Sequence, residues 1–189
     1  MTNMAQNENN WLQYNLLRVS RVHFVFVLAY AASIVAFDSW NLIPPEGLAQ
    51  RWTLAAVLLI ITTACWYLAQ VRIKHVSYYQ ALAWLLIIAD VMIAGFTVYA
   101  ERGMASRAVA LFVIPIVIAA TLMSRSALFA AAFLSTAVYS LAAVRYFAAF
   151  PSEGYKVELY GVIAFYSACF FIVAAFLNII RRQNSKPNS

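Results

Sequence analysis

The chain has 189 residues, of which 65% are hydrophobic and only 11% are charged, and its formal net charge is +6. A soluble domain of this size does not need so many apolar side chains, so the composition excludes a water-soluble globular protein. The charges separate apolar stretches of about 20 residues, the length of a helix that crosses a ~30 Å hydrocarbon layer. Because these stretches are continuously apolar and do not alternate, the sequence predicts an all-α, polytopic membrane protein.

The N-terminal segment differs in composition from the rest of the chain. Residues 1–10, "MTNMAQNENN", are polar and low in complexity, and we expect a disordered tail. Residues 11–21, "WLQYNLLRVSR", place Trp11, Tyr14, Leu17 and two arginines at helical spacing. This pattern predicts a short amphipathic helix that lies on the membrane interface before the first span.

Six predicted spans follow and form a transmembrane domain over residues 22–180. They are Val22–Trp40, Trp52–Val71, Tyr78–Ala100, Met104–Met123, Ser126–Phe150 and Glu158–Ile180. The short connections favour helical hairpins packed into a six-helix bundle. Pro115 falls midway along the fourth span, where its ring is expected to free a backbone carbonyl and kink the helix. Residues 181–189 are predicted to be a basic polar tail.

The lysines and arginines divide unequally between the two ends of the spans. One end has Arg18, Arg21, Arg72, Lys74, Arg125, Arg181, Arg182 and Lys186, and the other has Arg51, Arg102, Arg107, Arg145 and Lys156. The positive-inside rule therefore predicts that both termini are cytoplasmic. Anionic lipid headgroups at the inner face account for the excess positive charge, so nucleic acid is not expected as a partner.

One carboxylate, Asp90, lies in the third span within "LLIIADVMIAGF". An ionised Asp at the bilayer centre costs about 2.5–3.5 kcal/mol, so we expect its side chain to face the bundle interior. Other spans supply polar groups at a similar depth, and we predict a polar layer that comprises Asp90, Thr62, Thr63, Ser135, Thr136, Tyr139 and Ser167. Two interpretations stay open. Asp90 either fixes helix packing through a hydrogen bond, or changes its protonation or partner with a stimulus or along an ion path.

Other polar residues are weaker candidates for a site. A predicted outer charged cluster comprises Glu101, Arg102, Arg107, Arg145 and Glu158, which could meet an anion or simply extend their charges to the interface. Cys65 and Cys169 lack paired spacing, and His23 and His75 lie near one boundary, so neither a thiol relay nor haem is expected. The sequence has no phosphate-binding loop or metal-spaced acid cluster, so we expect no cofactor, no metal and no catalysis.

Several stretches together resemble the six-span membrane input module of bacterial sensor histidine kinases. They are "ALAWLLIIADVMIAGFTVYAERG", "SRAVALFVIPIVIAATLM" and "SALFAAAFLSTAVYSLAAVRYF", with the first-span opening "YNLLRVSRVHFVFVL" and the exit "NIIRRQN". The likeness is to the kinases that regulate pilus genes and to the related redox-responsive type. The chain lacks the Gly-Gly and Asn-Pro-Phe loop that the redox-responsive type associates with quinone, and keeps only Gly103 there.

The resemblance implies a sensory or regulatory module in the bacterial cytoplasmic (inner) membrane. Such a module would transmit a membrane or lipid-phase signal through helix packing, without a kinase part of its own. Its partners would be the bilayer and a second copy of the chain or a membrane or kinase protein. Two alternatives remain: a small transporter or channel subunit that uses Asp90 as its coupled group, and an accessory subunit of a membrane complex.

Overall fold

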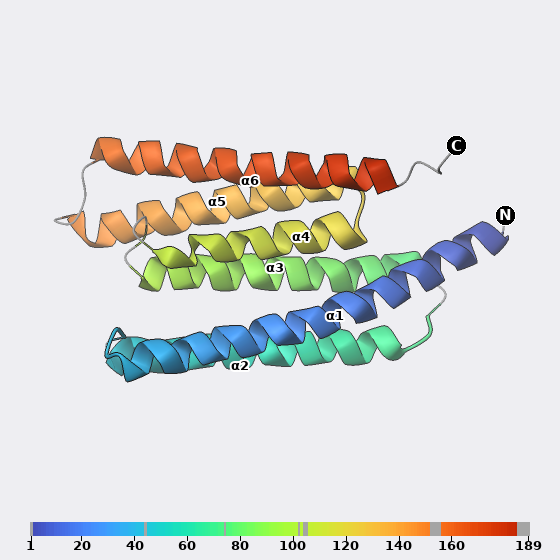
Figure 1. The fold of residues 1–189 in the computed structure, drawn as a ribbon, viewed down its shortest axis with the longest axis horizontal. Coiled ribbons are helices and arrows are strands. Elements are labelled where there is room, and N and C mark those ends of the chain that lie inside the picture. The colour runs from blue at the N-terminus through green and yellow to red at the C-terminus, as the bar shows by residue number, and fades with distance from the viewer. Residues whose placement is uncertain are drawn as a thin grey trace. The chain divides into compact units, whose positions relative to one another are not determined.

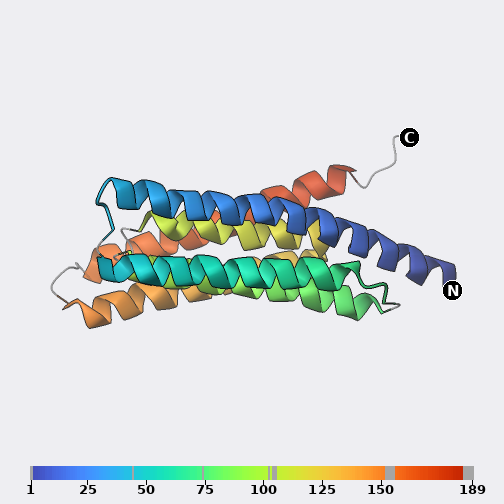
Figure 2. The same ribbon diagram turned by 90° about the horizontal axis from the view of Figure 1, so that it is seen from below.

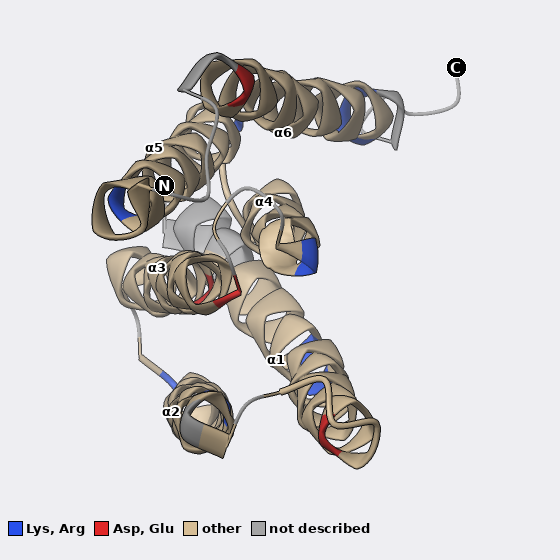
Figure 3. Cartoon of the chain, turned by 90° about the vertical axis from the view of Figure 1, so that its left-hand side faces the viewer, with Lys and Arg blue, Asp and Glu red and all other residues tan. Residues whose placement is uncertain are grey.

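The computed structural model describes the backbone of residues 2–43, 45–73, 75–101, 103, 106–151 and 156–184, and every regular element in this part of the chain is a helix. The elements are α1 (Thr2–Ser39), α2 (Pro45–Gln70), α3 (Val76–Ala100), the 3-10 helix η2 (Arg107–Phe112), α4 (Val113–Leu122), α5 (Arg125–Ala149) and α6 (Lys156–Asn184) (Figure 1). Charged residues occupy few positions on these helices (Figure 3). The predicted all-helical membrane fold is confirmed.

The chain divides into two compact units, Met1–Ala89 and Asp90–Ser189, and the boundary falls within α3. Unit 1 contains α1, α2 and the first part of α3. Unit 2 contains the rest of α3, η2, α4, α5 and α6. Each unit has its own packing contacts and is described separately below.

In unit 1, α1 packs along α2 through one of its two faces (Figure 2). Buried residues recur every three or four positions, as expected for a helix with one protein-facing stripe. They are Leu12, Leu16, Ser20, His23, Val27, Tyr30 and Ile34. The opposite face of α1 is exposed and includes Val22, Val25 and Leu28.

α1 is longer than the predicted first span because it is one continuous helix from Thr2. The backbone therefore shows no separate tail over residues 2–10 and no break between residues 11–21 and the span. The contacts of Asn9 with Ile73 and of Gln13 with Ala69 hold this part of α1 against the end of α2. The first turns of α1 extend past that end in both ribbon views (Figures 1 and 2).

The α1–α2 connection ends the first helix with a compact turn. Asn41 adopts a positive φ of 52°, which Asn tolerates better than most residues. The Leu42 N–H donates to Phe37 O and the Asn41 N–H donates to Asp38 O, each at 2.9 Å, which is the hydrogen-bond pattern of a Schellman cap. α2 then begins at Pro45, where the missing N–H of proline leaves no helical bond unmade.

The fourth span is built differently from the single α-helix predicted over Met104–Met123. Its described part begins as six residues of 3-10 helix in η2 and continues as ten residues of α-helix in α4. Met104 lies outside the described residues. Because a 3-10 helix rises about 2.0 Å per residue and an α-helix about 1.5 Å, the two segments extend about 27 Å. Residues 107–122 therefore come close to the ~30 Å hydrocarbon thickness despite their small number.

Within unit 2, α4, α5 and α6 contact one another, and α3 approaches α5 closely. Gly95 permits this approach, since a Cβ at this position would lie only 2.5 Å from Val138 Cγ1. At the end of α6, Arg181 and Arg182 belong to the helix, which continues to Asn184. The basic tail predicted over residues 181–189 therefore has a helical first part, and residues 185–189 lie outside the described part.

Candidate functional site

Asp90 lies well inside α3, ten residues before its C-terminal end. This distance corresponds to about 15 Å along the helix axis. Only 4% of the residue is exposed, and Thr97 on the same helix is also buried. An acidic group at this depth is costly in hydrocarbon, which makes Asp90 a candidate functional residue.

Three hydroxyl groups of α5 that were predicted to share a layer with Asp90 are buried. They belong to Ser135, Thr136 and Tyr139, and none has a hydrogen-bond partner among the described residues. A buried hydroxyl without a partner costs about 1–3 kcal/mol. We refer to these three groups as the α5 hydroxyls. The structure therefore leaves them unbonded to Asp90.

The remaining members of the predicted layer bond elsewhere. Thr63 and Ser167 donate to Leu59 O and Ile163 O of their own helices. The Thr62 hydroxyl donates to Leu58 O at 2.7 Å and lies 2.8 Å from His23 Nδ1. Since its hydrogen is directed at Leu58 O, Thr62 Oγ accepts from His23 Nδ1–H. This contact joins α1 to α2 inside unit 1.

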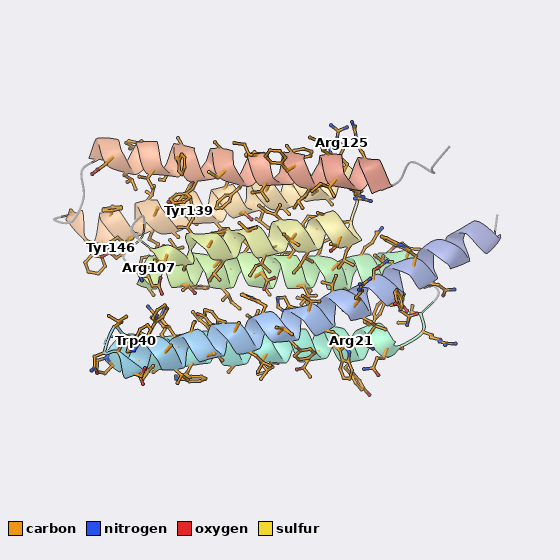
Figure 4. The ribbon with its side chains drawn as sticks, viewed as in Figure 1. Arg21, Trp40, Arg107, Arg125, Tyr139 and Tyr146 are labelled. Atoms are coloured by element: carbon orange, nitrogen blue, oxygen red, sulfur yellow. The ribbon has the colours of Figure 1, made fainter. Side chains whose placement is uncertain are left out.

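The ring of Tyr139, which Figure 4 labels, is the centre of an aromatic cluster in unit 2. Its centroid lies 5.9 Å from that of Phe112, 5.6 Å from that of Tyr166 and 6.1 Å from that of Phe170. These are ordinary distances for edge-to-face ring pairs. The cluster therefore connects the end of η2, the middle of α5 and the middle of α6.

α4 contacts α6 at both of its ends. Phe112, the N-cap of α4, packs against Phe170 with 5.6 Å between ring centroids. Met123, the C-cap of α4, accepts a hydrogen bond at its backbone oxygen from the guanidinium of Arg181. A cation at the C-terminus of a helix also interacts favourably with the helix dipole. Pro115 lies in the first turn of α4, directly after the change from 3-10 to α-helix.

The end of α2 and the turn to α3 are held by polar side chains in unit 1. Asn9 Nδ2 donates to Ile73 O at 2.7 Å, and Gln13 Nε2 donates to Ala69 O at 2.9 Å. The Tyr78 hydroxyl donates to Leu68 O, and the Tyr79 hydroxyl donates to Val71 O at 2.8 Å and accepts from Ile73 N–H at 3.2 Å. We call Asn9, Gln13, Tyr78 and Tyr79 the turn clamp. These bonds satisfy backbone groups that a helix end leaves without intrahelical partners.

The predicted outer charged cluster is only partly described. Glu101 Oε2 accepts a hydrogen bond of 2.9 Å from Ser106, whose hydroxyl also caps η2 by accepting from Ala108 N–H. Arg107, Arg145 and Glu158 are exposed, and Arg102 lies outside the described residues. Two residues after Glu101, Gly103 has a φ of +59°. A Cβ at this position would lie 3.0 Å from the Tyr146 side chain.

Cysteines and histidines do not assemble a metal site in the described part of the chain, where no group of three or more potential ligands occurs. Cys65 and Cys169 are free cysteines. His75 is exposed, whereas His23 is buried and contacts Thr62.

Sequence reasoning did not identify Phe112, Phe170 or Arg181 as site residues. Phenylalanines occur in five of the six predicted spans, so nothing in the sequence distinguishes the two rings that meet at Tyr139. The Arg181 contact depends on where α6 places its last turn relative to α4. The position of Arg181 directly after an apolar span is the only sequence signal for this contact. The same position also fits an arginine that extends its charge to the membrane interface.

Comparison with protein families places this chain in a known group. Residues 3–188 match the family described as the PilS-like transmembrane domain. Searches of curated proteins and of solved structures found no significant match. The match covers nearly the whole chain, and it agrees with the resemblance to a six-span sensor module and with a multi-pass protein of the bacterial inner membrane. The chain belongs to the family of PilS-like transmembrane domains.

Proposed function

We propose that this chain is a membrane sensory module that transmits a membrane or lipid-phase signal by changing how α4 and α6 pack, without catalysis of its own. Membership of the family supports a sensory role, because PilS-like domains are the membrane parts of a histidine kinase family. In this proposal both termini are cytoplasmic, and the partner is a second copy or a kinase.

The observation that carries the proposal is the double attachment of α4 to α6. Phe112 and Met123 lie eleven positions apart, and so do their respective partners on α6, Phe170 and Arg181. The two contacts follow the same order along both helices, so α4 and α6 run in the same direction. The attachments are about 16 Å apart along the helix axis. A shift of α4 along its axis would therefore displace Phe112 and Met123 together, and their contacts with Phe170 and Arg181 would move α6 in the same direction.

The start of α4 is the part of this unit best suited to change. A 3-10 helix has poorer hydrogen-bond geometry than an α-helix, and such stretches often mark hinges. Pro115 cannot donate a backbone hydrogen bond, so the η2–α4 junction has fewer bonds to break when residues exchange between the two helix types. Phe112 lies at that junction and packs against Tyr139 and Phe170, so a change at the junction would move these ring contacts.

A chimera tests this function directly. The chain would be joined after Asn184 to the catalytic region of a two-component histidine kinase, and autophosphorylation would be measured in membrane vesicles. We expect Arg181→Ala to change the activity several-fold, while Arg145→Ala, which removes an exposed arginine from α5 of the same unit, has a much smaller effect. Equal activities for both variants and the unchanged chimera would contradict the proposed route through α6.

Burial of Asp90 favours a second candidate function, coupling to protons or ions in a small transporter or channel. Proteoliposomes that contain the chain should then show a proton or cation flux that Asp90→Asn abolishes. A flux of this kind, together with a chimera insensitive to Arg181→Ala, would replace the sensory proposal with transport.

A further inference from the structure

We infer that the exposed face of α1 carries a binding surface for an anionic phospholipid, formed by Arg18 and Arg21 beneath Trp11 and Tyr14. The inference concerns a ligand of unit 1 and does not depend on the signalling role proposed for α4 and α6. It starts from the two-faced character of α1.

The four residues lie on one face of the helix. At 100° per residue, positions 11, 14, 18 and 21 fall within an arc of about 80°, opposite the buried stripe that contains Leu16 and Ser20. All four are exposed, Trp11 by 51% and Tyr14 by 66%. We call Trp11, Tyr14, Arg18 and Arg21 the α1 lipid stripe.

The same face continues into the membrane as Val22, Val25 and Leu28, each about two-thirds exposed. Apolar side chains on an outward-facing surface of a membrane span meet acyl chains. Whatever lies against the lipid stripe must therefore lie directly above those acyl chains, and phospholipid headgroups occupy that position. Continuity of this face favours lipid over a soluble protein as the occupant.

The height of the arginines also fits the headgroup layer. Gln13 lies level with the end of α2, because it donates to Ala69 O. α2 has 26 residues and is about 39 Å long, so it spans the hydrocarbon core and part of both headgroup layers. Arg18 lies about 7 Å deeper than Gln13 and Arg21 about 12 Å deeper. The hydrocarbon boundary then falls near Arg18, and a long arginine side chain at position 21 can extend back to it.

Charge identifies the class of lipid. Neither Arg18 nor Arg21 has an ion-pair partner among the described residues, and the exposed face between them and Leu28 carries no acid. Two arginines one turn apart, near the hydrocarbon boundary, suit a phosphate group with no neighbouring positive charge. A lipid with a net negative headgroup therefore fits better than a zwitterionic lipid.

The test is native mass spectrometry of the purified chain titrated with phosphatidylglycerol or with phosphatidylcholine of the same acyl chains. The variant Arg18→Gln/Arg21→Gln should bind phosphatidylglycerol roughly 30-fold more weakly at one site, because each surface cation contributes about a factor of five to anionic lipid binding. Binding of phosphatidylcholine should hardly change. Arg18→Lys/Arg21→Lys should keep most of the preference.

A matched control is Arg107→Gln/Arg145→Gln, which removes two exposed arginines from unit 2. It should leave the α1 site intact, and circular dichroism should show that both double variants keep their helices. Unchanged phosphatidylglycerol binding after Arg18→Gln/Arg21→Gln would overturn the inference. An equal loss in the control would overturn it as well, since the effect would then follow net charge and not the α1 lipid stripe.

Discussion

The turn clamp of unit 1 and the α5 hydroxyls of unit 2 differ in whether their polar side chains form hydrogen bonds. In the turn clamp, four side chains form hydrogen bonds with backbone groups of the α2–α3 connection. In α5, three hydroxyls within five residues have no partner in the described part of the chain. Among the described residues, unit 1 also contains two unpartnered polar atoms, Ser20 Oγ and Asn9 Oδ1 of the turn clamp, but the backbone groups of its connection between helices are bonded.

This difference indicates where the molecule can rearrange at low cost. Moving the α2–α3 turn would break hydrogen bonds to backbone groups at the end of α2, each of which contributes about 0.5–1.5 kcal/mol. Moving α5 against α4 or α6 breaks no hydrogen bond of the α5 hydroxyls and can create one. A region with unsatisfied hydroxyls is therefore a better place for a packing change than a region whose side chains hold backbone groups by hydrogen bonds.

Replacement of Tyr139 by Ala should have the largest effect on stability. The ring is fully buried and contacts Phe112, Tyr166 and Phe170, so its removal leaves a cavity among three helices. Truncations of this size cost about 3–5 kcal/mol in free energy of unfolding. Unfolding of the purified protein by increasing SDS measures the loss. A cost below that of Tyr14→Ala, at an exposed position of α1, would contradict the central place of the ring.

Tyr79→Phe should be the next most damaging change, although it removes a single atom. The hydroxyl donates to Val71 O and accepts from Ile73 N–H, so both backbone groups lose a partner. Two lost hydrogen bonds correspond to about 1–3 kcal/mol. The control is Tyr67→Phe, because Tyr67 is 66% exposed on α2. Equal stabilities of the two variants would show that the turn clamp contributes nothing.

Asp90→Asn should change stability little if Asp90 is only a packing group. Asn keeps the shape and one acceptor, and interhelical hydrogen bonds in membranes average about 0.6 kcal/mol. If Asp90 changes protonation during function, the variant should unfold normally but fix the kinase chimera in one activity state. The two measurements together separate the two interpretations. Normal stability with normal regulation would assign Asp90 to packing alone.

The general architecture was predictable from the sequence, because span length and apolar composition act on each helix separately. The all-helical fold, the membrane location and the family were confirmed on that basis. The η2 segment was not predictable, because Arg107–Phe112 is as apolar as many α-helices and its 3-10 form depends on its packing. The continuous α1 was missed for a similar reason. Asn9 looks like a tail residue, and Gln13 like part of a separate interfacial helix, until Ile73 and Ala69 are placed beside them.

The candidate site likewise has features that a single span determines and features that depend on packing between helices. An acid within an apolar span draws attention to Asp90 from sequence alone, since the cost of burying it is a property of that residue. Whether Ser135 bonds to it depends on distances between helices, which no single-span pattern contains. The Arg181–Met123 contact has the same origin, because it joins residues 58 positions apart.

Tyr139→Phe should also have a small effect, and its sign is the sharpest test of the comparison. The substitution keeps the ring and its three aromatic contacts, and removes a buried hydroxyl that has no partner. Loss of an unsatisfied polar group is neutral or stabilising, so we expect a gain of up to about 1 kcal/mol. Tyr79→Phe is chemically the same change with the opposite expected sign, and SDS unfolding of the two variants side by side measures both. A destabilised Tyr139→Phe would mean that the hydroxyl is bonded in the membrane, and the contrast between the two regions would then disappear. A stabilised variant whose kinase chimera has lost regulation would instead link the unsatisfied hydroxyl to the packing change itself.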